Sequence, residues 1–443
     1  MKNLSDSLID RPEYVAKLYA WKAKTDLVKI VTGVRRCGKS KLFSLFQAKI
    51  MAEDNVKANQ IININLEDLL QIREIGLEFD EQKFLVNYDK LLDYILSHLN
   101  SDKMNYVFID EIQLLRDWQL VVNTLRLRDN IDVYLTGSNA YMFSSDLANS
   151  FGGRYIEIKM QPFSFKEYVS AYQKRLVQNQ DTINLQEIYS HYIKESGFPQ
   201  TIDFSSNRQL INDYLLDTVY LNTIQKDIVK RFNITDTNKL DAVVHYLFDN
   251  IGNETSIRGI ERGLKAGGYN ISVPTIDTYI QGLLDSYLLY KCDRYDLKGK
   301  QFLDSNSKYY VADIGLRTAL LGHEDKDFGH LLENIVYLEL LRRGYKVSVG
   351  KVATKIIQQD GKNERKNLEV DFVAQKSGGE IEYYQVALYA LEPETLKREL
   401  SSLEAIDDNY PKFLLSMDYG SGENKGIKRL NVLDWLMAVE YNA

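Results

Sequence analysis

The sequence has few of the residues that build disulfide frameworks and zinc sites. It contains two cysteines, Cys37 and Cys292, and its five histidines are dispersed among 443 residues. Two distant cysteines cannot form the dense disulfide network of a small secreted domain, and neither has metal-ligand neighbours at the usual spacing. We therefore expect neither a disulfide framework nor a zinc centre.

Long apolar runs and a surplus of basic charge are also missing. No stretch approaches the roughly 18 consecutive apolar residues of a membrane-spanning helix, and the first residues, Met1 to Asp6, lack the apolar core of a signal peptide. The net charge is −7, so the chain as a whole does not attract nucleic acid or anionic membranes. With 44% hydrophobic and 26% charged residues, the composition is that of a globular protein, which we expect to be cytoplasmic.

Between Leu27 and about Met160, short apolar runs alternate with longer mixed segments. This alternation is typical of a parallel α/β sheet. Five strands are expected, at Val28–Thr32, Ile61–Asn65, Tyr106–Ile109, Val133–Thr136 and Tyr155–Lys159.

Beyond Pro162 the pattern changes. The segment from Phe165 to Phe232 reads as mostly helical, and residues 236–312 contain helical runs followed by two strands and a polar turn, as in a winged helix. The last section has an amphipathic segment at His330–Arg343 and then alternates strands with helices. Because the chain exceeds one ordinary core, we predict four segments, at residues 1–165, 166–235, 236–312 and 313–443.

A motif of the form GxxxxGK[ST] lies between the first strand and a helical run. Gly33 and Gly38 permit positive φ angles and close backbone approach, so that successive N–H groups can wrap a phosphate at a helix N-terminus. Lys39 adds a positive charge for the β and γ phosphates, and the Ser40 hydroxyl is a ligand for Mg²⁺. The flanking strand and helix argue against a chance match in a turn. The motif predicts ATP or ADP with Mg²⁺, held by Gly33, Val34, Arg35, Arg36, Cys37, Gly38, Lys39, Ser40 and Lys41.

A second motif, at Tyr106–Glu111, is an apolar strand that ends in two carboxylates. Asp110 would hold the magnesium, usually through water, and Glu111 would act as general base on the attacking water. The alternative is an Asp-Glu pair at the surface without a role in the site. The upstream phosphate loop makes this alternative less favoured.

A third candidate position follows the strand at Val133–Thr136. In such sheets the strand between the two motif strands presents a polar side chain to the γ-phosphate, and we assign this sensor position to Ser138 or Asn139, with Thr136 behind them. An ordinary turn is an equal alternative for any one of the three.

The motifs together resemble, in order and spacing, a large family of prokaryotic AAA+ superfamily ATPases with a C-terminal domain of unknown function. The resemblance covers nearly the whole chain. It implies an α/β P-loop NTPase core with sheet order 5-1-4-3-2 and glutamate-assisted hydrolysis, but no substrate. The segments that carry it are Gly33–Ser40, Phe108–Gln113 with Trp118, Leu135–Ala140, Gly152–Tyr155, Pro162–Tyr168, Tyr309–Arg317, Leu331–Tyr345 and Glu369–Val373.

AAA+ enzymes commonly complete their site with an arginine from a neighbouring subunit. The resemblance makes Arg154, in the Gly-Gly-Arg turn before the fifth strand, the best positional match, which implies a homo-oligomer. A structural salt bridge is an equal alternative for this residue.

The winged-helix segment gives little support for sequence-specific DNA recognition. Its third helical run, Val273–Leu289, contains Asp277 and Asp285 and no lysine or arginine, whereas a recognition helix normally carries basic and amide side chains. A protein-interaction role is favoured. DNA binding stays an alternative because the wing contains Arg294, Lys298 and Lys300.

The last segment has the layout of a PD-(D/E)xK nuclease, with acids at Glu333 on a helix and Asp371 on a strand. In an active enzyme the next strand supplies a second metal carboxylate and, two residues later on the same face, a lysine. Those positions hold Gln385 and Ala387. We therefore expect an inactive nuclease-like scaffold, with metal binding by Glu333, Glu369 and Asp371 as the less favoured alternative.

Three functions follow from these patterns. The first is a Mg²⁺-dependent AAA+ ATPase in which nucleotide state rearranges a helical lid, the winged helix and the nuclease-like segment around a protein partner. The second is an ATP-regulated DNA-binding protein. The third is a nucleotide-binding interaction protein that keeps ADP and turns over too slowly to matter.

Overall fold

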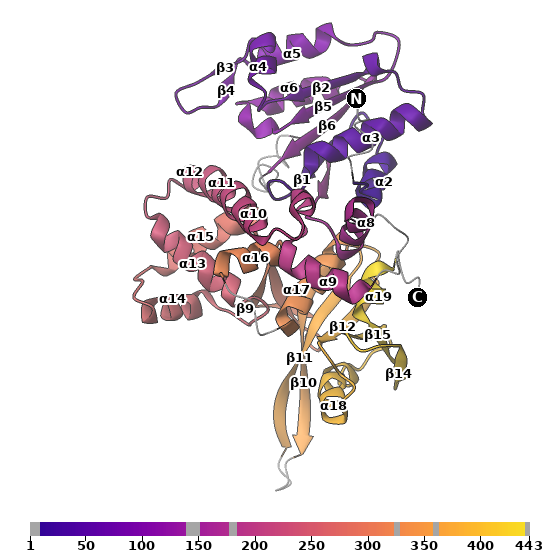
Figure 1. Cartoon of the computed structure of the whole chain (residues 1–443), viewed down its shortest axis with the longest axis vertical. Helices are drawn as coiled ribbons and strands as arrows, with labels where there is room; N and C mark the ends of the chain where they lie inside the picture. The colour runs from indigo at the N-terminus through magenta and orange to yellow at the C-terminus, as the bar shows by residue number, and fades with distance from the viewer. Residues whose placement is uncertain (1–8, 139–150, 177–183, 323–327, 358–362, 439–443) are drawn as a thin grey trace. The chain divides into compact units, whose positions relative to one another are not determined.

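The computed structural model describes residues 9–138, 151–176, 184–322, 328–357 and 363–438 (Figure 1). By its internal contacts the chain divides into two compact units. The first comprises residues 1–162 and 285–287, and the second comprises residues 163–284 and 288–443. Among the described residues, no helix combines the length and the apolar character that crossing a bilayer requires.

The first unit contains a sheet of five parallel strands in the order β2-β5-β6-β1-β7. Counted along the chain, this is the order 5-1-4-3-2 that the resemblance implies. All five predicted strands are present, and three of them have the predicted bounds. The strands are β1 (Val28–Thr32), β2 (Ile61–Asn65), β5 (Asn105–Asp110), β6 (Ile131–Gly137) and β7 (Tyr155–Lys159).

Helices and short strands connect these five strands. They are α2 (Pro12–Ala20), α3 (Lys39–Glu53), η1 (Ala58–Gln60), α4 (Leu69–Ile75), β3 (Glu78–Phe79), β4 (Leu85–Val86), α5 (Tyr88–Ser97), η2 (Ile112–Leu114) and α6 (Trp118–Arg126).

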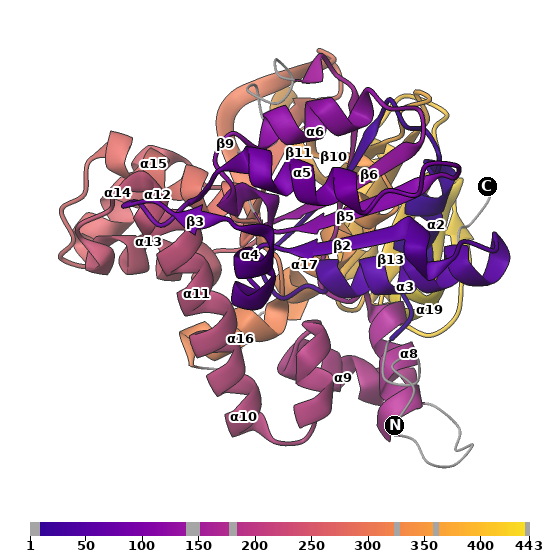
Figure 2. The same ribbon diagram turned by 90° about the horizontal axis from the view of Figure 1, so that it is seen from above.

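Both faces of the five-stranded sheet are covered, because side chains alternate between the faces of a strand. One face carries branched aliphatic residues that pack with α5 and α6 in one apolar cluster. The other face carries Phe108 and Tyr134, whose rings stack 4.8 Å apart, and Phe43 and Phe46 of α3 contact them edge-on or tilted. Figure 2 shows α3 and the pair α5 and α6 on opposite sides of the sheet. Packing of helices on both faces holds the five strands in place, including the carboxyl ends of β1, β5 and β6 at which the candidate site lies.

One ion pair lies entirely within this core. Lys29 on β1 and Asp132 on β6 are both 0% exposed, and the Lys29 ammonium donates to Asp132 Oδ1 and, over 2.7 Å, to the carbonyl of Lys24. The second oxygen of Asp132 accepts from the Tyr134 hydroxyl and from the N–H of Ala23, both at 2.8 Å. Burial lowers the pKa of Lys29, and Asp132 opposes that effect.

The first part of the second unit is helical, as the sequence predicts for Phe165–Phe232. Three further helices follow and lead into the strands β8 and β9, in the predicted order. The elements are α8 (Phe165–Leu176), α9 (Leu185–Glu195), η4 (Pro199–Phe204), α10 (Arg208–Asp213), the π-helical turns η5 (Tyr214–Tyr220) and η6 (Ile224–Val229), α11 (Leu221–Thr223), α12 (Lys230–Phe232), α13 (Thr237–Asp249), α14 (Ile257–Ala266) and α15 (Val273–Asp285).

The second unit also contains an eight-stranded sheet in the order β14-β15-β13-β12-β11-β10-β8-β9. Its strands and helices are β8 (Leu289–Asp296), β9 (Gln301–Val311), α16 (Ile314–Leu321), α17 (Phe328–Arg342), β10 (Lys346–Ile357), β11 (Asn363–Gln375), β12 (Ile381–Ala387), α18 (Pro393–Glu404), β13 (Lys412–Ser416), β14 (Gly422–Asn424), β15 (Ile427–Asn431) and α19 (Val432–Met437). Strand β8 pairs in parallel with β10, so the two strands of the predicted winged-helix segment share a sheet with the last segment. The predicted boundary at residues 312/313 stays a prediction.

The helix α17 is not amphipathic, and that expectation was wrong. Every residue from Leu331 to Leu340 is buried. Its polar residues have partners inside the protein: the Asn334 side-chain amide accepts from the N–H of Val311 at 2.8 Å and donates to its carbonyl at 3.0 Å. Since β9 is an edge strand, Asn334 satisfies main-chain groups that a neighbouring strand would otherwise satisfy.

Candidate functional site

The phosphate-binding motif forms a loop between β1 and α3. Gly33 has φ +145°, and a Cβ atom at this position would lie 2.0 Å from the carbonyl oxygen of Met160, so that only glycine fits. Gly38 has φ 105° and directly precedes Lys39, the first residue of α3. The two glycines therefore take the positive φ angles that a phosphate-wrapping loop requires, at the N-terminus of a helix.

An arginine that the sequence analysis did not identify supports this loop. The buried guanidinium of Arg11 donates to the carbonyl of Cys37 at 3.2 Å and to that of Gln161 at 2.8 Å. The Cys37 thiol is also buried, and burial raises its pKa. Because Val34 and Cys37 are both fully buried, they can offer a ligand only main-chain atoms.

The charged side chains of the motif have different surroundings. Lys39 is 5% exposed, and its ammonium donates to the carbonyls of Gly33 at 2.9 Å and Val34 at 3.3 Å. Arg35 pairs with Glu67 at 3.8 Å. The exposed residues of the motif are Arg36, Ser40 and Lys41.

The second half of the site forms at the end of β5, beside β6. Ser40 Oγ donates to Asp110 Oδ2 over 2.6 Å, and the Thr136 hydroxyl donates to the other oxygen of the same carboxylate. The Thr136 hydroxyl also accepts from the N–H of Glu111 at 2.9 Å. Burial raises the pKa of Asp110, and the hydrogen bonds from Ser40 and Thr136 oppose that effect. Adjacent hydroxyl and carboxylate oxygens are ligands that Mg²⁺ accepts, so these residues fit the metal.

Glu111 lies at a sharp bend directly after β5. Its φ of 54° is in the left-handed region, which is uncommon for a residue with a side chain, and the residue is buried. The side-chain amide of Gln113 donates to Glu111 Oε2 and, at 3.2 Å, to Ser138 Oγ. Gln113 thereby joins the candidate base to a candidate sensor. The position of Gln113, two residues after Glu111, is the signal in the sequence that could have identified it. The other candidate sensor, Asn139, lies outside the described residues.

Arg154 and the phosphate loop lie at opposite ends of two neighbouring strands. Arg154 is exposed and immediately precedes β7, which runs parallel to β1 in the register Val28↔Tyr155 to Thr32↔Lys159. The phosphate loop follows Thr32 at the other end of these strands. Five strand residues span about 17 Å, so Arg154 is far from the phosphate loop of its own chain.

Residues 25–169 match the family model described as an AAA domain, and residues 186–327 match a domain of unknown function. A protein of Haemophilus influenzae is 34% identical to this chain over 435 residues, which cover 98% of the chain and 100% of the relative. This chain belongs to the family of that protein. Its AAA domain contains both halves of the site described above, from Gly33 to Ser138.

A second member of this family comes from Methanocaldococcus jannaschii. The protein MJ1544 is 30% identical over 395 residues, which cover 86% of this chain and 79% of the relative. Both relatives are described as uncharacterized proteins.

Solved structures similar to the chain include two at low sequence identity. The Walker-type ATPase PABY2304 of Pyrococcus abyssi has a TM-score of 0.45 and 15% identity, and the alignment covers 71% of this chain and 96% of that structure. A RuvB variant of Thermotoga maritima has a TM-score of 0.33 and 14% identity, covering 64% of this chain and 90% of that structure.

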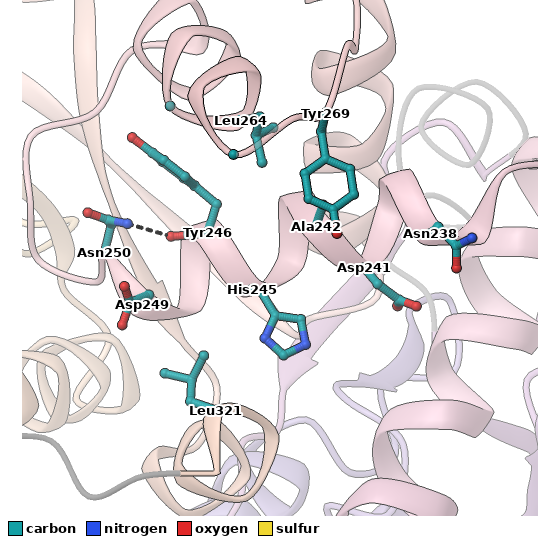
Figure 3. A pocket seen from close by; sticks show the side chains of 12 residues that line it. Asn238, Asp241, Ala242, His245, Tyr246, Asp249, Asn250, Leu264, Tyr269 and Leu321 are labelled. Carbon is teal, nitrogen blue, oxygen red and sulfur yellow. Dashed lines mark hydrogen bonds between the residues drawn. The ribbon is translucent and has the colours of Figure 1, made fainter.

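The second unit contains an open pocket of about 800 Å³ that the sequence analysis did not predict (Figure 3). No lysine or arginine is among the described residues that line it. The lining residues are Asn238, Asp241, Ala242, His245, Tyr246, Asp249, Asn250, Gly263, Leu264, Gly267, Tyr269 and Leu321.

Proposed function

We propose that this chain is a Mg²⁺-dependent ATPase whose nucleotide state controls the segments after its AAA domain. The observation that carries the proposal is the hydrogen bond of 2.6 Å between Ser40 and Asp110, with Glu111 fixed next to them through Thr136. Ser40 thus meets Asp110 and Glu111, which follow it by 70 residues or more, at one end of the sheet. This arrangement supports two metal ligands and one base at the same place.

Each residue then has a definite task. Ser40 and Asp110 would hold Mg²⁺, which when bound offsets the negative charge of the phosphate oxygens. The loop N–H groups bind phosphate oxygens, and the Lys39 ammonium exchanges its two carbonyl partners for the β and γ phosphates. Glu111 accepts the proton of the attacking water. Gln113 keeps the Glu111 carboxylate oriented toward that water.

The position of Arg154 supports an oligomeric enzyme. An exposed arginine at the end of the strands opposite the phosphate loop cannot contact the nucleotide of its own chain, but it can contact that of a neighbouring copy. An arginine supplied in this way stabilises the charge of the transition state in related phosphoryl transfers. We infer that ATP hydrolysis requires a homo-oligomer.

A route for nucleotide state to reach later segments begins directly before the phosphate loop. Thr32 donates to Glu157 Oε1 at 2.8 Å, and the Tyr287 hydroxyl donates to the same oxygen at 3.0 Å. Tyr287 belongs to the tripeptide 285–287 that is part of the first unit. A shift of the loop at Gly33 would therefore act on the connection between α15 and β8.

The direct test measures nucleotide binding and Mg²⁺-dependent phosphate release on the same preparations. We expect Lys39→Ala to lose binding, and Glu111→Gln to keep binding but lose turnover by two or more orders of magnitude. Lys49→Ala is the matched control, since Lys49 lies on the same helix α3 in an exposed pair with Glu53, and it should behave as wild type. Tightly bound ADP without Mg²⁺-dependent release at any protein concentration would instead establish a nucleotide-binding interaction protein.

Subunit mixing tests the arginine separately. Arg154→Ala and Glu111→Gln should each be inactive alone, but a mixture should regain part of the activity, because sites with an intact Glu111 then receive Arg154 from the other variant. No recovery in mixtures that do form oligomers would exclude Arg154 as an arginine acting between subunits. Salt-sensitive binding of DNA to the wild type would favour an ATP-regulated DNA-binding protein.

A further inference from the structure

The nuclease-like layout of the last segment implies a metal ion, and the residues at that position do not fit one. Within the described residues, no group of three or more histidine, cysteine or carboxylate side chains is arranged to hold a metal. The position at which a second carboxylate is expected holds Gln385. Its side-chain amide donates to Glu399 at 3.1 Å and accepts from Ser402 at 3.1 Å. That side chain is thus bound to α18.

A lysine from another strand lies among the acids instead. Lys308, on β9, is 4% exposed, and its ammonium is 2.8 Å from an oxygen of Glu333 and 2.8 Å from an oxygen of Glu369. A divalent cation between these two carboxylates would need each oxygen at about 2.1 to 2.6 Å. The ammonium therefore lies where such an ion would have to bind.

Two further side chains, Tyr310 and Asp371, belong to the cluster that Lys308 forms with Glu333 and Glu369. Each has a hydrogen-bond partner within the protein. The Tyr310 hydroxyl, two residues along the same face of β9, donates to Glu333 Oε1 at 2.6 Å. Asp371 Oδ2 accepts from the N–H of Val386 at 2.8 Å. Burial lowers the pKa of Lys308, but the charges of Glu333, Asp371 and Glu369 raise it above its ordinary value.

We propose that Lys308 is a built-in counter-cation that takes the place of the metal ion and fixes the β8–β9 hairpin to α17 and β11. The cluster is then a structural centre that needs no metal. A buried charge is stable only when it is paired and hydrogen-bonded. Withdrawing Lys308 would remove the ammonium that Glu333 and Glu369 share. Among the described residues, the buried Glu333 would keep only Tyr310 and His330, the latter at 3.5 Å, as partners, so moving β9 away from α17 is costly. This inference does not depend on ATP hydrolysis.

The test compares the full-length wild type with Lys308→Met, Glu333→Gln and the double variant by thermal unfolding. We expect each single variant to melt about 10 °C lower. The double variant, which removes an ammonium and a carboxylate together, should fall by clearly less than the sum. If Lys308→Met alone does not fold, the double variant must still fold, and an equal failure of both would refute the proposal.

Titration with Mn²⁺ then examines the cation position itself. All four proteins keep the same phosphate loop, so any Mn²⁺ bound there is common to them. Lys308→Met should gain one additional Mn²⁺ and a higher Tm in its presence, and the double variant should lose that gain. The proposal is overturned if Lys308→Met gains no Mn²⁺, or if the wild type already binds an Mn²⁺ that Glu333→Gln removes. Mn²⁺-dependent DNA cleavage by the wild type, abolished in Lys308→Met, would also overturn it by making Lys308 catalytic.

Discussion

Replacing Lys29 by methionine isolates the contribution of the buried ion pair in the nucleotide-binding core. Methionine is unbranched and reaches as far as the lysine Cε, so it keeps the apolar contacts of the side chain while it removes the ammonium. Asp132 would then be a carboxylate with 0% exposure and without its cationic partner. The substitution therefore measures what the pair contributes to stability in the β1–β6 region.

The expected loss is about 4 kcal/mol. Breaking a buried pair by removing one partner costs roughly 3–5 kcal/mol, because the remaining charge stays buried. Asp132 keeps two hydrogen bonds, from Tyr134 and from the N–H of Ala23, which places the cost of the charge near the lower limit. The carbonyl of Lys24 also loses its partner at 2.7 Å, which adds about 1 kcal/mol.

Native-state hydrogen exchange read by mass spectrometry localises this loss to the strands concerned. Amides of β1 and β6 that exchange by opening of the core should exchange about a thousand-fold faster, since about 1.4 kcal/mol corresponds to a factor of ten. Lys49→Met is the matched control, because its exposed pair with Glu53 should contribute less than about 0.5 kcal/mol. Adding Asp132→Asn to Lys29→Met should recover part of the stability.

The reasoning is refuted if Lys29→Met exchanges no faster in β1 and β6 than Lys49→Met does. That result would mean that the core relaxes to hydrate Asp132 or that the carboxylate takes up a proton at little cost.

Two further predictions concern side-chain amides. Gln113→Leu should lower kcat for ATP by about 10–100-fold with an unchanged KM, since a hydrogen bond to a charged group contributes about 1.5–3 kcal/mol. Phosphate release measured beside the exposed control Gln82→Leu checks this, and a wild-type kcat would contradict it. Asn334→Ala should lower the free energy of unfolding of the full chain by about 2–4 kcal/mol, because the N–H and carbonyl of Val311 lose their partner. Urea unfolding gives the value, and a change below about 0.5 kcal/mol would contradict the role of Asn334.

The strands and motifs of the AAA domain could be predicted because their determinants are local. Strand β1 is a short run of buried residues that ends directly before Gly33. The motif that follows fixes the residue types at Gly33, Gly38, Lys39 and Ser40. Likewise, Asp110 and Glu111 follow an apolar strand. Each of these signals lies within a few adjacent residues.

Side chains that act across long sequence distances could not be predicted in this way. Arg11 bonds to Cys37 and Gln161, which lie 26 and 150 residues away along the chain. Lys308 contacts Glu333 from a different element of structure, so the residues adjacent to Lys308 in the sequence do not indicate this contact. The helix α17 misled for the same reason, because a buried polar residue such as Asn334 looks in sequence like one that faces water.

The three residues Asp285 to Tyr287 have a consequence for how this protein can be divided. The chain leaves the first unit after Pro162 and returns to it for this tripeptide alone, more than a hundred residues later. A fragment cut after Pro162 would contain both nucleotide motifs but would lack Tyr287, the hydrogen-bond donor to Glu157. The segment up to Pro162 is therefore not a complete folding unit: dissection or domain exchange at that point removes the tripeptide from the unit to which it belongs.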